Sequence, residues 1–412
     1  MKLRYFFFIT ILTVFQVFAS SNSNVNSDSD VNDCCFEENC TYDGCAYTYP
    51  FHQLECNFGF FVTGEYLYWF AKETDLVLTQ KLVSQQIDDL ITFIPLNTYY
   101  SFPTELISFR KNWDSGLRLG AGSISWCDKW DFYVNWTFFK NDTKSKALVN
   151  PIGTGAANDY LLNPWTNPLF GTDLHFDPLD LAFYGFSPLY TEIKGIWREK
   201  FNIIDGEIGR KFYLSRCMTL RPFFGVRGAW DRNRFNVSSL LEDREDGVIS
   251  TNIVEYKNRF CGVGLVGGFQ PNWYFFSLFS IFANADFALL WGRQEVARTE
   301  QNNGRLLDLE NFNPLIPETS FKDHSMQAML DLALGLRFES AFCCNRYQLG
   351  LDIGWEHHIW FSHNQRYQLR NGIGGLNRDT DFTEVAFLTT AFDFVCTDLS
   401  YGGLVVKGRF DF

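Results

Sequence analysis

The last ten residues of the chain alternate strictly between two kinds of position. Leu404, Val406, Gly408, Phe410 and Phe412 share one face, and Val405, Lys407, Arg409 and Asp411 share the other. A period of two predicts a β-strand with two different faces. A strand with an apolar face, a charged face and an aromatic end is typical of a closed barrel in a membrane.

The same alternation recurs along the chain and predicts nine earlier strands. They lie at 59–72, 113–126, 130–138, 204–212, 220–231, 253–269, 279–291, 326–339 and 347–358. Together with the C-terminal segment they make ten spanning strands, and twelve are allowed if 142–190 contains a further pair. An even number is expected because bacterial single-chain barrels begin and end on the same side of the membrane.

The predicted connections alternate between short and long. The turns near 127, 216, 271 and 343 are short, and the linkers 73–105, 142–190, 235–252, 293–323 and 361–400 are long. This layout predicts an all-β, antiparallel, up-and-down transmembrane barrel with short periplasmic turns and long extracellular loops. Because an even number of spanning strands is expected, 361–400 is interpreted as one external loop with local hairpin structure.

The N-terminus predicts export. Lys2 and Arg4 precede an apolar run at 5–18, and Ala19 fits a cleavage site, so 1–19 is interpreted as a cleaved signal peptide. The apolar run is too short to serve as a membrane anchor. Residues 20–58 are predicted to be a disordered, cysteine-bearing periplasmic segment, and 59–412 to be the outer-membrane barrel.

Composition narrows the class of protein further. Phe, Trp and Tyr make up 18% of the chain, and no apolar run after the signal reaches the roughly 18 residues of a membrane helix. Removing Lys2 and Arg4 leaves 33 basic against 48 acidic residues, a net charge of −15, which argues against nucleic acid or anionic lipid headgroups as general partners. A secreted β-sandwich is the alternative, but this length would need two or more domains, and no linker separates such halves.

Charged residues fall on the face that a barrel turns inward, because a Lys or Arg facing lipid costs about 2–4 kcal/mol at the midplane. The predicted lumen-lining residues are Glu65, Asp114, Arg118, Asp131, Asp205, Glu207, Lys211, Arg221, Arg227, Asp231, Asp286, Asp331, Arg337, Glu339, Asp352, Glu356, Lys407 and Arg409. They fit a water-filled pathway for solutes. They also fit a network of ion pairs that fills a narrow barrel.

The sequence offers little for catalysis or metal binding. It contains no Gly-x-Ser-x-Gly elbow, and its six His are scattered, so no enzyme activity and no cofactor are expected. The spacing of Cys34, Cys35 and Cys40 does not match a zinc site. His357 and His358 are adjacent on a strand and face opposite sides.

The cysteines are unevenly distributed. All 11 lie after the signal, and the odd number leaves at least one thiol free or paired between chains. Nine candidates for disulfides lie in the N-terminal segment or beside the short turns: Cys34, Cys35, Cys40, Cys45, Cys56, Cys127, Cys217, Cys343 and Cys344. Because exported proteins meet an oxidising compartment, we expect a disulfide layer on the periplasmic side, within the chain or between copies. Reduced thiols that are simply tolerated in turns are the alternative.

Several stretches resemble, in order, the major-outer-membrane-protein-like family of Legionella and chlamydia-related bacteria. The similarity covers most of 59–412 and is carried by 64–69, 71–73, 126–131, 135–137, 220–227 and 403–412. The resemblance implies a pore-forming outer-membrane protein and identifies no ligand. By analogy with cross-linked chlamydial envelopes, it also implies disulfides to other cysteine-rich envelope proteins. The long segment 20–58 departs from the family pattern.

Two functions are therefore expected. The first is a porin-like barrel in the bacterial outer membrane that passes small hydrophilic solutes, with a structural envelope role through disulfides. The alternative is a non-conducting structural or adhesive surface protein with a packed interior. The expected partners are outer-membrane lipid and the barrel-assembly machinery, because a C-terminal residue such as Phe412 resembles the signal that this machinery reads.

Overall fold

The structure, a computed structural model, describes most of the chain from residue 58 onward. The described residues are 58–74, 76–86, 99–125, 129–149, 157–166, 189–215, 217–243, 247–276, 278–304, 318–342, 347–377 and 385–412. The predicted signal peptide (1–19) and cysteine-bearing segment (20–58) lie outside these ranges, except for Phe58. In the ranges given, no helix is long and apolar enough to cross a membrane.

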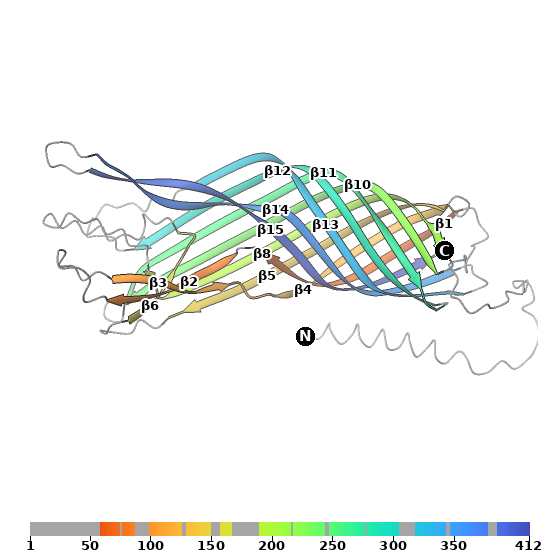
Figure 1. Ribbon diagram of the computed structural model, residues 1–412, viewed down its shortest axis with the longest axis horizontal. Coiled ribbons are helices and arrows are strands. Elements are labelled where there is room, and N and C mark those ends of the chain that lie inside the picture. The colour runs from red at the N-terminus through yellow and green to blue at the C-terminus, as the bar shows by residue number, and fades with distance from the viewer. Residues whose placement is uncertain are drawn as a thin grey trace, which may run out of the picture. The chain divides into compact units, whose positions relative to one another are not determined.

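Ten antiparallel strands close into a barrel, as predicted (Figure 1). The barrel closes where β1 pairs with β15, and β10 pairs with β11 like the other neighbouring strands. The strands are β1 (Phe58–Glu73), β4 (Trp113–Ser125), β5 (Trp130–Leu148), β8 (Glu192–Arg210), β10 (Met218–Asp243), β11 (Gly247–Tyr274), β12 (Phe279–Gly304), β13 (Glu318–Phe342), β14 (Tyr347–Asn377) and β15 (Val385–Asp411).

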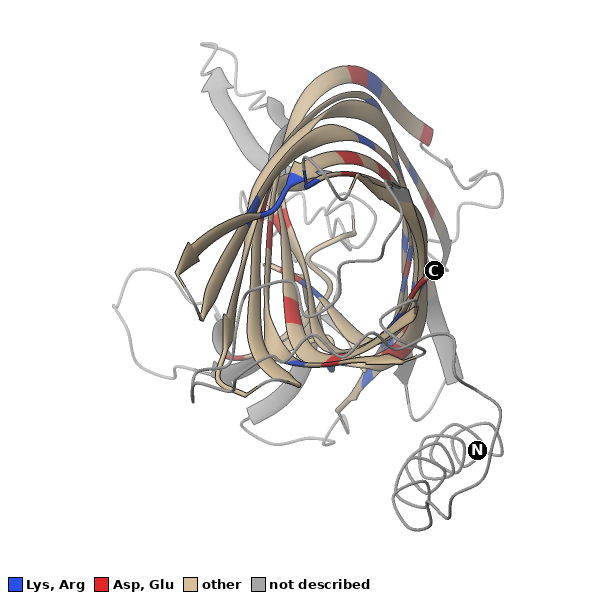
Figure 2. Ribbon diagram, turned by 90° about the vertical axis from the view of Figure 1, so that its right-hand side faces the viewer, with Lys and Arg blue, Asp and Glu red and all other residues tan. Residues whose placement is uncertain are grey.

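Strand register separates the two faces of the barrel wall. Residues directly opposite each other in an antiparallel sheet share a face, and Glu65 lies opposite both Arg118 and Lys407. Large apolar side chains on the other face are exposed, including Phe132 at 50% and Leu334 at 60%. This outward apolar belt meets lipid, and Glu65, Arg118 and Lys407 lie on the opposite, inward face. Charged positions of both signs are distributed around the barrel wall (Figure 2).

The C-terminus closes the barrel at the end that carries the short turns. Phe412 donates its backbone N–H to the carbonyl of Phe60 and accepts a bond from the Phe60 N–H, both at 2.9 Å. The C-terminal strand therefore pairs with the first strand at their shared rim. In Figure 1 this rim lies beside the label C, and the loop end lies opposite. Both ends of the barrel chain thus lie at the periplasmic side expected for such barrels.

The barrel strands are longer than the sequence pattern predicted. The linkers 235–252, 293–323 and 361–400 are largely continuations of the β10–β11, β12–β13 and β14–β15 hairpins, so a local hairpin at 361–400 was the right expectation. Beyond the lipid both faces of a strand can be polar. The backbone ladder therefore continues where the apolar alternation that identifies a strand has ended.

One predicted turn is misplaced. The sequence suggested a turn near 271, but β11 continues to Tyr274 and the chain reverses at 275–278. Pro271 has no N–H, and the paired register of β11 with β12 skips from Phe269 to Asn272. The proline therefore interrupts the ladder within the strand and does not end it.

Four further strands form a separate sheet in the order β3-β2-β6-β7. They are β2 (Val77–Gln86), β3 (Tyr99–Ser108), β6 (Ala157–Leu162) and β7 (Leu189–Tyr190), and a short β9 (Phe212–Ser215) pairs with β10. The linkers 73–105 and 142–190 thus contribute strands to a loop-end sheet. They add no eleventh or twelfth strand to the described barrel.

Candidate functional site

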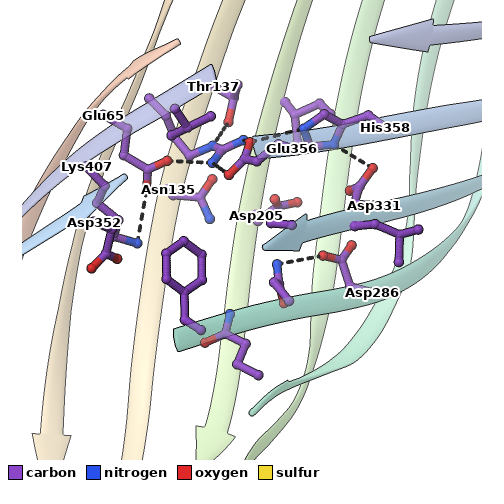
Figure 3. Close-up of a pocket in the computed structure, with 18 of the residues that line it drawn as sticks. Glu65, Asn135, Thr137, Asp205, Asp286, Asp331, Asp352, Glu356, His358 and Lys407 are labelled. Atoms are coloured by element: carbon purple, nitrogen blue, oxygen red, sulfur yellow. Dashed lines mark hydrogen bonds and ion pairs between the residues drawn. The ribbon is translucent and has the colours of Figure 1, made fainter. Parts of the chain in front are cut away.

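The barrel interior holds a charged cavity at the level of the apolar belt (Figure 3). It offers about 120 Å³ to the centres of water-sized molecules, which is room for several waters because each needs roughly 10–15 Å³ by this measure. Seven carboxylates, four Lys or Arg side chains and His358 line it. The formal charge of the lining is therefore −3 when His358 is neutral.

Arg118 organises one side of the cavity. Its guanidinium donates to both Glu356 carboxylate oxygens at 3.0 Å, to Glu65 at 2.5 Å and to the Thr137 hydroxyl at 2.9 Å. Lys407 reaches the second oxygen of Glu65 at 3.0 Å. The five strands β1, β4, β5, β14 and β15 are thereby joined through their inward side chains.

Arg227 organises the opposite side. Its guanidinium donates to Asp205 at 2.7 and 3.2 Å, to Asp331 at 2.5 Å and to Asp286 at 3.2 Å. His358 approaches Asp331 at 2.7 Å from β14. Three carboxylates on one guanidinium leave excess negative charge, and water in the cavity beside them would lower the cost of burying this charge.

The structure places the eighteen predicted lumen residues at several levels of the interior. Eleven line the cavity: Glu65, Arg118, Asp205, Glu207, Arg227, Asp286, Asp331, Arg337, Asp352, Glu356 and Lys407. The others lie outside that lining.

Most of these other residues lie towards the periplasmic rim. Arg221 pairs with Asp131 and with Glu207, the latter at 3.2 Å. Arg409 pairs with Asp411 at 2.6 Å. At the same end, Glu339 accepts a hydrogen bond from the Tyr274 hydroxyl at 3.5 Å, and Lys211 lies between β8 and β9.

Two predicted lumen residues lie nearer the loop end. Asp114 accepts hydrogen bonds from the side chains of Asn112 and Asn141 at 3.0 and 2.9 Å. Asp231 contacts His363. Neither residue lines the cavity.

A layer of aromatic side chains crosses the barrel on the loop side of the cavity. It consists of Trp69, Phe139, Phe201, Trp360 and Tyr401, which come from five different strands and are at most 2% exposed. The ring centroids of Phe201 and Tyr401 lie 4.8 Å apart, and those of Trp69 and Phe139 lie 5.5 Å apart. We call this set the aromatic layer. Trp69, Phe201 and Trp360 also line the cavity, so the layer closes it towards the loops.

A polar layer that the sequence did not predict lies beyond the aromatic layer. His363 contacts Asp231 at 2.9 Å and Gln327 at 3.1 Å, and Gln294 donates to the His363 carbonyl at 2.7 Å. A register shift separates Trp360 from Asn364. This irregularity breaks the period-two pattern, which is why the inward position of His363 could not be deduced from alternation.

The segment 163–166 fills the loop end of the barrel. The Trp165 ring lies 5.0 Å from Phe235 and 6.0 Å from Tyr256. Arg298 donates to the Trp165 carbonyl at 2.9 Å, and Arg366 stacks over its ring at 5.4 Å. These partners belong to β10, β11, β12 and β14, so Trp165 lies between strands from different parts of the wall. No sequence signal distinguished this residue within the linker 142–190.

The candidate cysteines are mostly outside the described ranges. Cys217 is described, and it carries a free thiol at the short turn between β9 and β10. Cys261 and Cys396 are free and exposed. Among the described residues, no group of three or more His, Cys, Asp or Glu side chains is arranged to hold a metal ion.

A closed ten-stranded barrel with an apolar outer belt and a charged interior defines an outer-membrane β-barrel protein. The family model of the Legionella pneumophila major outer membrane protein precursor matches residues 55–412, so the chain belongs to that family. None of the curated proteins compared with the chain matches it.

Three solved structures are distantly similar to the chain. The outer membrane protease OmpT of Escherichia coli shares 8% identity with a TM-score of 0.35, over 86% of this chain and 96% of that one. A Pseudomonas aeruginosa FadL homologue shares 8% identity with a TM-score of 0.22, over 86% and 90%. The toluene transporter TodX of P. putida shares 7% identity with a TM-score of 0.18, over 86% and 89%. At these scores the activities of those proteins carry no argument for this one.

Proposed function

We propose that the barrel passes small hydrophilic solutes across the outer membrane and that the aromatic layer holds it closed in its resting conformation. The observation that carries this proposal is the charge-lined cavity, large enough for several waters, at the level of the lipid belt. A barrel that served only as a scaffold could fill this volume with apolar side chains at lower cost, because each buried charge loses hydration. No catalytic step is part of the proposal.

In the proposed closed state, two structural elements block the barrel: the aromatic layer and Trp165. They are attached to the barrel wall in different ways. The aromatic layer is built from side chains of the barrel wall, whereas Trp165 enters on a connection between strands. Trp165 is fixed by side-chain contacts, such as the donation of its indole N–H to the Val77 carbonyl at 2.8 Å. Opening requires rotation of the layer and withdrawal of the 163–166 segment, with no break in the barrel ladder.

Planar-bilayer recording of the purified protein tests the proposal. We expect the unaltered barrel to be closed most of the time, and the triple variant Trp69→Ala, Trp165→Ala, Trp360→Ala to conduct at least tenfold more. The matched control removes three outward Trp side chains, with the changes Trp130→Ala, Trp230→Ala and Trp291→Ala. Silence of both variants at every voltage would contradict a pathway through the barrel.

The second candidate is a non-conducting structural or adhesive surface protein. It is favoured by the complete burial of the aromatic layer and by the packing of His363, Gln294 and Trp165 beyond it. Small barrels are often filled by side chains. The recording above separates the two candidates, because a purely structural barrel stays silent when the three inward Trp side chains are removed.

We further propose that the chain is exported by a cleaved signal peptide, inserted by the barrel-assembly machinery and anchored by periplasmic disulfides. The position of Cys217 at the short-turn end, near the rim where Phe412 ends, supports a cysteine layer on that side. Its partners would be other cysteines of this chain, a second copy, or cysteine-rich envelope proteins.

A further inference from the structure

A row of cations crosses four neighbouring strands on the outer face of the barrel. Lys140 on β5 lies opposite Lys200 on β8, Lys200 lies opposite Arg232 on β10, and Arg232 lies opposite Arg259 on β11. All four side chains are exposed. Adjacent strands are about 4.8 Å apart, so the row covers roughly 15 Å.

A second row lies two residues further towards the loop end on the same strands. Arg198 lies opposite Arg234, and Arg234 lies opposite Lys257. Asp142 occupies the β5 position of this row and approaches Arg198 at 3.4 Å. We call the two rows the cationic patch. It contains seven Lys or Arg side chains and one carboxylate, on a chain whose net charge is −13.

Like charges directly opposite each other destabilise a sheet, and the protein compensates few of these. Lys257 pairs with Glu255 at 3.2 Å, and Arg198 pairs with Asp142. Glu295 lies opposite Arg259 but pairs with Lys322 at 3.1 Å. Within the described ranges, the remaining members of the patch form no ion pair. Lys200 instead rests 5.6 Å from the centre of the Phe138 ring.

The patch begins where the lipid belt ends. Trp230, which is 42% exposed, precedes Arg232 by two residues and marks the outer edge of the belt on β10. On β8, which runs from the loop end towards the short turns, Ile204 follows Lys200 by four residues and is also 42% exposed. The cations therefore lie on the loop side of the belt at the depth of the outer-leaflet headgroups, where aromatic residues mark the interface.

We propose that the cationic patch binds the phosphate groups of outer-leaflet lipopolysaccharide. Lys and Arg are the side chains that recognise phosphate, Arg through paired N–H donors and Lys as a point charge. A phosphorylated glycolipid places its acyl chains along the apolar belt and its phosphates against the two rows. This binding would neutralise the charges that the protein leaves unpaired, and it is independent of whether the barrel conducts.

The test uses the folded mature protein in detergent, with purified lipopolysaccharide as the probe. The patch variant is Lys200→Gln, Arg232→Gln, Arg259→Gln. The matched control is Lys72→Gln, Lys111→Gln, Lys322→Gln, which removes three exposed cations that lie outside the patch. Lipid retained per barrel is counted by native mass spectrometry, and heat-modified mobility in gels verifies that each variant is folded.

We expect the patch variant to bind lipopolysaccharide at least tenfold more weakly and the control to stay within twofold of the unaltered protein. Enzymatically dephosphorylated lipopolysaccharide should bind the unaltered protein as weakly as intact lipid binds the patch variant. Equal losses in the two variants would show only a general attraction between surface cations and the leaflet. Undiminished binding of the dephosphorylated lipid would overturn the assignment to phosphate. Free inorganic phosphate that competes at micromolar concentration would identify a small-anion site instead.

Discussion

Arg227 forms ion pairs with three carboxylates in the barrel interior. It is 4% exposed and holds three aspartates from β8, β12 and β13. Removing one partner of a buried ionic cluster typically costs about 3–5 kcal/mol, since the remaining charges lose their compensation. We therefore expect Arg227→Ala to lower the free energy of unfolding by about that amount, as measured by urea unfolding of the folded barrel in detergent.

Arg232→Ala is the control for the Arg227→Ala prediction, because both residues lie on β10. Arg232 faces outward and is exposed, so in lipid-free detergent Arg232→Ala should change the free energy of unfolding by no more than about 0.5 kcal/mol. If both substitutions had equally small effects, the ion pairs of Arg227 would not stabilise the barrel.

At the level of single residues, the alternation of apolar and polar positions was enough to place Glu65, Arg118 and Arg227 on the inward face. Successive side chains of a strand point to opposite faces, so the apolar positions determine which face the others take. The alternation was not enough to show which inward residues meet. Contacts such as that between Arg118 and Glu356 join positions 238 apart in the sequence. Whether a charge lies in the cavity or beyond the aromatic layer depends on the tilt and register of all ten strands.

At the level of the strands, those in the lipid belt could be identified because lipid on one side and water on the other impose the alternation. The loop-end extensions of β10 to β15 lie outside that constraint and were assigned to linkers. The separate β2, β3, β6 and β7 sheet was missed for the same reason. Trp165 belongs to this part of the chain, so its entry into the barrel could be seen only in three dimensions.

The pairing of the last strand with the first leads to a prediction for Phe412. Deleting this residue removes two backbone hydrogen bonds to Phe60 and a ring contact with Phe410 at 5.9 Å. Loss of these contacts at the closing seam, together with the loss of the proposed assembly signal, should lower surface assembly several-fold while synthesis is unchanged. Surface labelling against total protein measures this. Phe412→Tyr, which keeps the ring and the backbone bonds, should assemble normally, and normal assembly of the deletion would count against the role of Phe412.

At the level of the whole molecule, the proposed disulfide layer predicts bonds that survive extraction. Boiled, non-reduced protein should migrate as a compact monomer or as cross-linked species, and reduction should convert these to one extended band. A Cys261→Ser, Cys396→Ser variant is the control, since both thiols are exposed and free in the structure. A single unreduced monomer band with all 11 cysteines open to alkylation would refute the layer.

The charge of the cavity predicts the preference of the pathway. Seven carboxylates against four Lys or Arg side chains leave a negative lining, which concentrates cations and repels anions. In a potassium chloride gradient, the reversal potential of the open triple variant should therefore have the sign of cation preference. The reversed sign would mean that the charges in the cavity do not line the conducting route.

Single-channel recording tests most directly whether the barrel contains a pathway that is closed in the resting protein. The protein with Trp69, Trp165 and Trp360 changed to Ala should give discrete openings at least ten times the mean current of the unaltered protein. The control without Trp130, Trp230 and Trp291 should resemble the unaltered protein. Folded triple-variant barrels that insert into the bilayer and pass no current would contradict the account and leave the protein as a structural element of the outer membrane.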